Sequence, residues 1–207
     1  MPIIDFTVPG TNCYEAGGVI HHNSGKSTAC AFEMTLHLTG RYDDFPWWPG
    51  RRFDRPIVAW AAGSDAKTVR ETMQPILFGQ PGNLGTGMIP GEDIKNTTAR
   101  SGTPEAIDAA LIRHVSGGTS RLVLKSYDQG RTSFEGAKVD AIWLDEEPPS
   151  SVYFECLTRT MDTTGGNNNG LVMCSWTPLN GLSSIVLMFL PGGKAPDEDS
   201  TVSTGTE

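Results

Sequence analysis

Five consecutive residues near the N-terminus have the types and order that bind phosphate. Ser24, Gly25, Lys26 and Ser27 match the second half of a Walker A loop, and Thr28 follows them. Backbone amides at the start of a helix point toward phosphate, and the lysine adds a positive charge near the β and γ phosphates. The hydroxyl of the Ser27 type ligates Mg²⁺. Because so short a motif is common by chance, it predicts an ATP site only in combination with a second motif.

A pair of carboxylates supplies that second motif. The apolar run at 141–144 ends in Asp145 and Glu146, as a Walker B strand does. At the end of a buried strand Asp145 reaches the water shell of Mg²⁺, and Glu146 orients or deprotonates the attacking water. The alternative is a solvated acidic turn that caps the following helix, which explains Glu147 better than Asp145. We therefore predict Ser27 and Asp145 as the Mg²⁺ site and Glu146 as the catalytic residue.

A third polar position follows the next apolar run, at 171–176. Thr177 begins the segment Thr-Pro-Leu-Asn-Gly-Leu-Ser. In P-loop motors a polar residue at this point of the fold senses the γ-phosphate, so Thr177 is a candidate sensor. A simple strand-ending turn with Pro and Gly explains the segment equally well.

The elements that must position these residues alternate between strands and helices. Apolar runs bounded by Gly, Pro, Ser or Asp predict strands buried on both faces at 56–61, 121–125, 139–144 and 171–176. Helices are predicted at 26–38, at 65–77 with Ser64 as cap, at 105–115 and at 150–161. Loops are expected at 79–102 and 163–170, and a polar tail at 191–207. The alternation predicts an α/β fold of the P-loop type, with a mainly parallel sheet flanked by helices.

Composition narrows the class of protein. Apolar residues make up 38% and charged residues 19% of the 207, and no apolar run is long enough to span a membrane. A net charge of −8 argues against broad, sequence-independent coating of DNA by this surface. The four cysteines form no CxxC pair and the histidines complete no zinc pattern, so a reducing cytoplasm is the simplest compartment.

Three segments resemble the terminase large subunit of tailed phages. They are the Walker B region at 130–149, the coupling segment at 177–183, and the segment Trp-Trp-Pro-Gly-Arg-Arg-Phe at 47–53. The resemblance implies an ATP-driven motor in the cytoplasm of an infected bacterial host. It also implies double-stranded DNA, a portal protein, a small terminase subunit and other motor subunits as partners, and no membrane. The family usually continues into a nuclease, for which this chain leaves no room, so we assign it no DNA cleavage.

The phosphate loop itself is cut. Walker A spacing requires a glycine five positions before Gly25, where this chain has Ile20, and Gly18 lies two positions too early. A β-branched approach cannot wrap closely around phosphate. The family's adenine-contacting segment and the arginine of the first loop half are missing as well. The site is therefore half a phosphate loop that begins abruptly at Ser24.

The residues at the cut have the chemistry of a splicing junction. The side-chain amide of Asn23 can attack its own backbone carbonyl and cleave the following peptide bond, while His22 donates a proton to the leaving amine. The hydroxyl of Ser24 can accept the acyl group beforehand. Alone, the tripeptide is also compatible with a surface turn.

Residues 5–23 resemble the last two conserved blocks of inteins. The resemblance implies that His22 is the penultimate histidine, Asn23 the cyclising asparagine and Ser24 the first extein residue. Asn12 stands where that family usually has a histidine, a role that His21 could take. Because Met1 directly precedes this tail, we expect the C-terminal fragment of a split intein, whose partner is an N-terminal intein and extein fragment. The expected domains are an intein tail at 1–23, a partial ATPase domain at 24–193 and a polar tail at 194–207.

Two other hypotheses stay open at this point. One is a stand-alone P-loop ATPase or helicase with an irregular loop, in which the first 23 residues form an ordinary β-hairpin. The other is a binding or scaffold module that retains only remnants of an ATP site.

Overall fold

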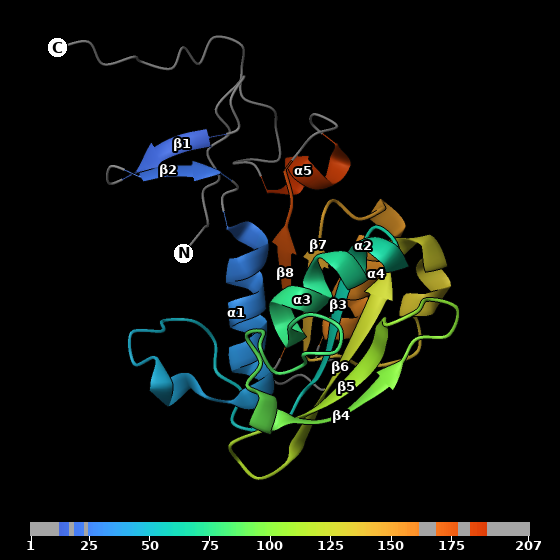
Figure 1. Ribbon diagram of the computed structural model, residues 1–207. Helices are drawn as coiled ribbons and strands as arrows, with labels where there is room; N and C mark the ends of the chain where they lie inside the picture. The colour runs from blue at the N-terminus through green and yellow to red at the C-terminus, as the bar shows by residue number, and fades with distance from the viewer. Residues whose placement is uncertain (1–12, 17–18, 23–24, 162–168, 178–182, 190–207) are drawn as a thin grey trace, which may run out of the picture. The chain divides into compact units, whose positions relative to one another are not determined.

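The computed structural model describes the backbone of residues 13–16 and 19–22, and residues 25–161, 169–177 and 183–189 in full (Figure 1). The chain divides into two units, residues 1–176 and 177–207, which are described separately. The strands are β1 Cys13–Ala16, β2 Val19–His22, β3 Val58–Gly63, β4 Ile94–Ala99, β5 Ile107–Arg113, β6 Thr119–Ser126, β7 Ala141–Asp145 and β8 Leu171–Ser175. The α-helices are α1 Lys26–Thr39, α2 Ala66–Glu71, α3 Met73–Phe78, α4 Ser150–Thr160 and α5 Ser184–Met188.

Strands β3 to β8 form one mixed sheet in the order β4-β5-β6-β3-β7-β8. Strands β6, β3, β7 and β8 run parallel, and β5 and β4 add antiparallel pairs at one side. Strands β1 and β2 form a separate antiparallel hairpin. The expected α/β fold with a mainly parallel sheet flanked by helices is confirmed.

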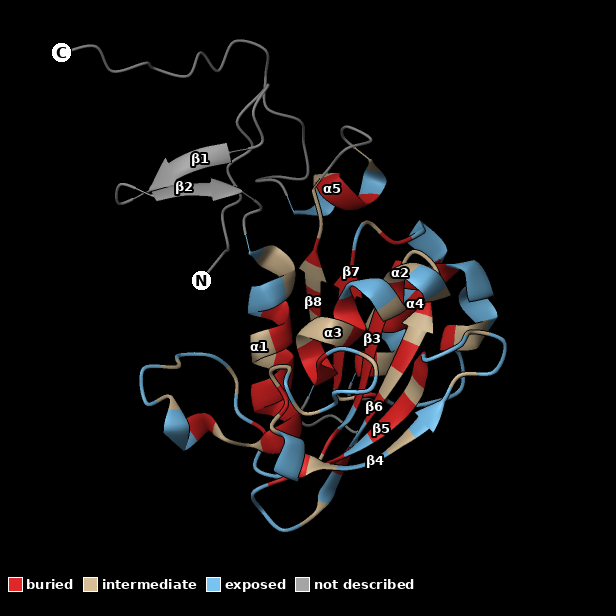
Figure 2. Ribbon diagram, viewed as in Figure 1, coloured by how far each residue is buried: buried red, intermediate tan, exposed pale blue. Residues whose placement is uncertain are grey.

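The parallel strands are buried on both faces, which explains their continuous apolar sequences. In β3, Ala59 and Ala61 pack in the main core, which also contains side chains of α1, α2 and α3. The intervening Trp60 packs edge-to-face against Phe134 instead. Figure 2 shows the buried residues along β3 and β7, and Figure 1 shows α4 on the opposite side of the sheet from α1. Trp143 on β7 is fully buried, and truncation of such a side chain typically costs about 3–5 kcal/mol.

The predicted strands are all present, with ends that move by at most two residues for the site-bearing β7 and β8. Helices α1 and α4 also match their predicted ranges closely. Apolar continuity and helix-start signals were therefore sufficient to predict α1, β7 and β8, which carry or adjoin the predicted site residues.

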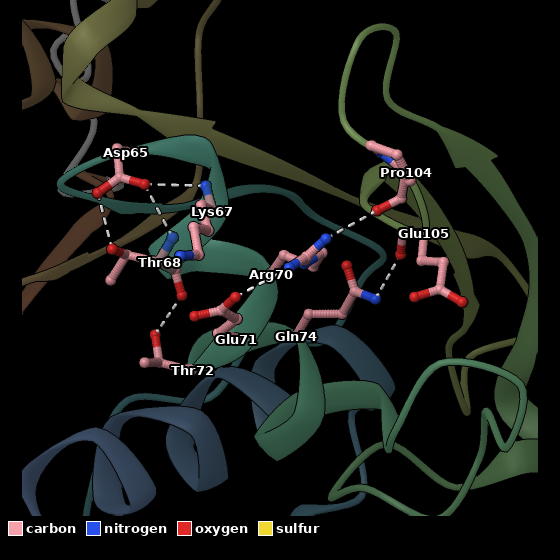
Figure 3. A network of polar contacts seen from close by, with 9 residues as sticks. All are labelled: Asp65, Lys67, Thr68, Arg70, Glu71, Thr72, Gln74, Pro104 and Glu105. Carbon is pink, nitrogen blue, oxygen red and sulfur yellow. Dashed lines mark hydrogen bonds and ion pairs between the residues drawn. The ribbon is translucent and has the colours of Figure 1, made fainter.

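The helix predicted at 105–115 is wrong, because these residues form strand β5 between β4 and β6. Glu105 adopts a left-handed conformation with φ of 59°, which does not start a right-handed helix. The side chain of Gln74 then fixes the backbone before β5, because its Nε2 donates to the Glu105 carbonyl at 2.9 Å (Figure 3). Its Oε1 accepts the Ile107 amide at 2.9 Å. Pairing with β6 thus overrides the local helical preference of the segment.

The loop predicted at 79–102 is also wrong in part, because its end forms the edge strand β4. This strand is mostly exposed and rich in polar residues, so it lacks the apolar alternation from which a strand is predicted. The predicted loop at 163–170 and the tail at 191–207 lie almost wholly outside the described residues.

The helix predicted at 65–77 is two helices, α2 and α3, that meet at Thr72. Pro75 explains the break, because it cannot donate the amide hydrogen that would continue the first helix. The cap is Asp65 rather than the predicted Ser64. One Asp65 carboxylate oxygen accepts the amides of Lys67 and Thr68, each at 2.9 Å, and the other accepts the Thr68 hydroxyl at 2.7 Å (Figure 3).

In the described part of the chain, no helix combines the length and apolar character needed to cross a membrane.

The helix cap at Asp65 leads to a prediction about the stability of the fold. Hydrogen bonds from the Thr68 amide and hydroxyl lower the pKa of the Asp65 carboxyl. A lowered folded-state pKa stabilises the fold above the unfolded-state value, and this stabilisation is lost as the pH falls through the folded value. Asp65→Ala should therefore lower the free energy of unfolding by about 1 kcal/mol at pH 7, and by less below pH 4, in urea titrations. The control Lys67→Ala should change it little, and an equal loss in both variants would contradict the cap.

Candidate functional site

The residue before α1 adopts a backbone conformation that only glycine adopts readily. Gly25 is the N-cap residue, with φ of 70°, and its carbonyl accepts the Ala29 amide at 2.8 Å. The first turn of an α-helix is where backbone amides bind an anion. Gly25 and Thr28 are exposed, and Lys26 and Ser27 are half-buried. The predicted phosphate-binding residues thus lie together at one helix end.

Ser27 and Asp145 meet although 118 positions separate them in the sequence. The Ser27 hydroxyl donates to Asp145 Oδ1 at 2.7 Å, and Asp145 is the last residue of β7. The carboxylate is buried, with 7% of the residue exposed. Helix α1 packs on β7 and β8, and its N-terminus lies at the carboxyl edge of the sheet (Figure 1). A hydroxyl and a carboxylate side by side are oxygen ligands of the kind that Mg²⁺ takes together with substrate phosphates.

A third side chain, which was not predicted from the sequence, binds the same carboxylate oxygen. The Ser175 hydroxyl donates to Asp145 Oδ1 at 2.6 Å and accepts the indole N–H of Trp143 at 2.7 Å. Ser175 is 4% exposed. The chain of hydrogen bonds from Trp143 through Ser175 and Asp145 to Ser27 therefore joins β7, β8 and α1 at one point. Its only sequence signal is a polar residue at the end of an apolar strand.

Glu146 leaves the strand in a strained conformation. Its φ is 63°, in the left-handed region, which costs a residue other than glycine about 1–3 kcal/mol. Its amide donates to the Ser175 carbonyl at 2.9 Å, and its side chain is exposed. The turn thus directs Glu146 into solvent directly beside the buried Asp145. Glu147 is half-buried, and Pro149, whose side chain makes no capping hydrogen bond, is the N-cap residue of α4.

Tyr127 contacts the backbone of the same turn, and this contact was not predicted from the sequence either. Its hydroxyl lies 2.9 Å from the Asp145 carbonyl oxygen, 3.1 Å from that of Ala62 and 3.3 Å from that of Glu146. Burial, and then the charge of Asp145, raises the pKa of the hydroxyl above its usual range. The hydroxyl therefore keeps its single hydrogen and donates it to the nearest of these oxygens, the Asp145 carbonyl.

The nearby thiols are not nucleophiles. Burial raises the pKa of Cys30 to about 12, although the Ser175 hydroxyl partly offsets the effect. Burial likewise raises the pKa values of Cys156 and Cys174 to about 12. Cys156 is buried as predicted, whereas Cys174 is only partly buried. Thiols with these pKa values stay protonated at neutral pH, so these three cysteines are not expected to act as nucleophiles.

The four remaining predicted residues lie in the second unit or have side chains that the structure does not describe. Thr177 directly follows Trp176 and begins the second unit. His22 ends strand β2, where its backbone pairs with Cys13. Asn23 and Ser24 lie outside the described residues. The sensor role of Thr177 and the splicing roles of His22, Asn23 and Ser24 stay predictions.

Comparison with known proteins decides the family. The family model described as the N-terminal part of the terminase large subunit, T4likevirus-type, matches residues 22–200. The chain belongs to this family. The large terminase subunit of Salmonella phage P22 is 37% identical over 197 residues, which cover 86% of this chain and 38% of that protein. This terminase chain thus spans well under half the length of its curated relative.

Two solved structures are similar to this terminase chain. One is the large terminase ATPase domain of Thermus phage P74-26, with a TM-score of 0.46 and 19% identity over 74% of this chain and 55% of that one. The other is the large terminase of a thermophilic bacteriophage in complex with ATP-gamma-S, with a TM-score of 0.40 and 15% identity over 73% of this chain and 30% of that one.

Proposed function

We propose that this chain carries the larger part of an ATPase centre that drives DNA packaging, and that its phosphate loop is completed by protein splicing at Ser24. The observation that carries the proposal is the contact between Ser27 and Asp145 at the N-terminus of a 14-residue helix. Membership in the terminase family supports it.

In the proposed reaction, this chain's residues bind and orient MgATP. The amides at the start of α1 and the Lys26 ammonium would hold the phosphates, and Ser27 and Asp145 would hold a Mg²⁺ ion, which would offset the charge that develops on the transferred phosphoryl group. Glu146 orients the attacking water and accepts its proton. Thr177, at the start of the coupling segment, would sense the γ-phosphate.

The missing half of the loop supports the second part of the proposal. The family match begins at residue 22, within two residues of Ser24, and residues 1–21 lie outside it. Residues 5–23 resemble an intein end instead. Excision of residues 1–23 would join Ser24 to an upstream fragment that supplies the first loop half and its arginine. His22 would assist, Asn23 would cyclise, and Ser24 would accept the acyl group.

The sheet offers a place for such a fragment. Among the described strands, β8 lies at the edge of the sheet, yet its sequence Leu-Val-Met-Cys-Ser is apolar like that of a central strand. Exposed apolar edges are usually covered. A strand that precedes α1 in the joined protein would pair there.

The partners proposed for the joined protein are those of a packaging motor. They are double-stranded DNA, a portal protein, a small terminase subunit and further motor subunits, in the cytoplasm of an infected bacterial host. A net charge of −8 fits a motor that grips DNA in a local channel better than one that coats it.

Glu146→Gln tests the catalytic assignment. In the protein joined at Ser24, the exchange should lower the kcat for ATP at least about 100-fold, because an amide cannot accept the proton of the attacking water. Binding of ATP, measured by calorimetry, should stay nearly unchanged. The neighbouring Glu147→Gln is the matched control and should keep turnover. Equal activity in the two variants would place the catalytic base elsewhere.

Asn23→Ala tests the splicing assignment. When the chain is co-expressed with an upstream intein fragment, mass spectrometry should find residues 24–207 joined to the partner's extein. The exchange should block cleavage before Ser24, because alanine has no side-chain amide to cyclise, whereas Asn83→Ala should leave the product unchanged. Retention of residues 1–23 by the unaltered chain with every partner would refute splicing.

A further inference from the structure

Tyr127 links the ends of strands β6, β3 and β7. It follows strand β6 as the first residue of a short 3-10 helix, Tyr127–Gln129. Its hydroxyl reaches the carbonyl of Ala62 near the end of β3 and those of Asp145 and Glu146 at the end of β7. In the sheet, β3 lies between β6 and β7, so the side chain crosses over the end of β3.

The base of Tyr127 is itself held firmly. A capping box between Ser126 and Gln129 closes the 3-10 helix, and the Asp128 amide donates to the Ser64 carbonyl at 3.2 Å. The guanidinium of Arg100 donates to the Ser126 hydroxyl at 2.9 Å. The Tyr127 ring is 8% exposed and contacts Phe134, with 6.5 Å between the ring centroids. The hydroxyl thus sits on a rigid support.

The turn that Tyr127 contacts requires such support. Glu146 is one of two described residues other than glycine with a positive φ, and its conformation is disfavoured without compensating contacts. On one side its amide donates to Ser175 on β8. On the other side the Asp145 carbonyl, which belongs to the same peptide group as the Glu146 amide, accepts the Tyr127 hydroxyl hydrogen at 2.9 Å. The peptide between the two acidic residues is therefore fixed from both sides.

We propose that Tyr127 is a positioning residue for hydrolysis, whose hydroxyl locks the peptide between Asp145 and Glu146 and so aims the Glu146 carboxylate. Tyr127 does not touch substrate in this role. The inference rests on the proposed role of Glu146 and adds a residue from outside both Walker motifs to the same site.

Tyr127→Phe tests the proposal, because it removes the hydroxyl and keeps the ring. In the full chain, hydrogen exchange of the Glu146 amide, followed by NMR, should accelerate about tenfold relative to amides in β6. In the protein joined at Ser24, kcat should fall about tenfold or more while the KM for ATP stays within about twofold.

Tyr42→Phe is the matched control. The Tyr42 hydroxyl is also buried, contacts His37 Nδ1 at 2.8 Å and accepts the Phe53 amide at 3.0 Å. It lies near the C-terminal end of α1, roughly 20 Å along the helix from the site. This exchange should lower thermal stability without changing exchange at Glu146 or kcat.

A second variant separates positioning from general stability. Glycine adopts a positive φ without strain, so in a Glu146→Gly background the loss of the Tyr127 hydroxyl should change the unfolding equilibrium constant several-fold less than in the unaltered chain. An equal change in both backgrounds, or unaltered exchange at Glu146 in Tyr127→Phe, would overturn the proposal. Altered exchange in a joined protein that hydrolyses no ATP would sustain the lock and refute the ATPase function instead.

Discussion

The hydrogen bond between Ser27 and Asp145 is the constraint on which the arrangement of this domain depends. It requires the first turn of α1 and the last residue of β7 to meet at one edge of the sheet. The parallel order of β6, β3, β7 and β8 places several strand ends at that edge. Burial of α1 against the sheet then fixes the helix end where its amides can face an anion.

The buried polar side chains that make this contact are held by further hydrogen bonds. Asp145 Oδ1 accepts two hydroxyls, and Ser175 is held in turn by the Trp143 indole. An unmade bond at such a buried point typically costs about 1–3 kcal/mol, so the carboxylate is held in one position before any ligand arrives. Glu146 beside it is exposed and strained, and the contacts to Ser175 and Tyr127 offset that strain. In the proposed reaction, the rigid Asp145 would hold the metal ion, and the neighbouring Glu146 carboxylate would face the attacking water.

The sequence predicted the elements that follow from local patterns, and it did not predict the features that depend on packing. Apolar runs predicted β3, β6, β7 and β8, and the glycine–lysine motif predicted the start of α1. The same reasoning made a helix of β5, because its strand conformation depends on pairing with β4 and β6 and on Gln74, which lies 33 positions before Ile107. It also missed Ser175 and Tyr127, whose roles arise from hydrogen bonds across 30 and 18 or more positions. Such contacts leave no periodic pattern in the chain.

The phosphate loop contains both the proposed phosphate-binding residues and the proposed splicing junction. From Gly25 onward the site has the geometry of a nucleotide-binding helix start, and before Ser24 the sequence has neither the glycine nor the arginine of such a loop. Calorimetric titration with MgATP, of the full chain and of the protein joined at Ser24, tests this view most directly. The account predicts affinity at least about 100-fold higher, or about 2.7 kcal/mol, in the joined protein. Equal affinity in both would contradict it, and would favour a stand-alone ATPase with an irregular loop.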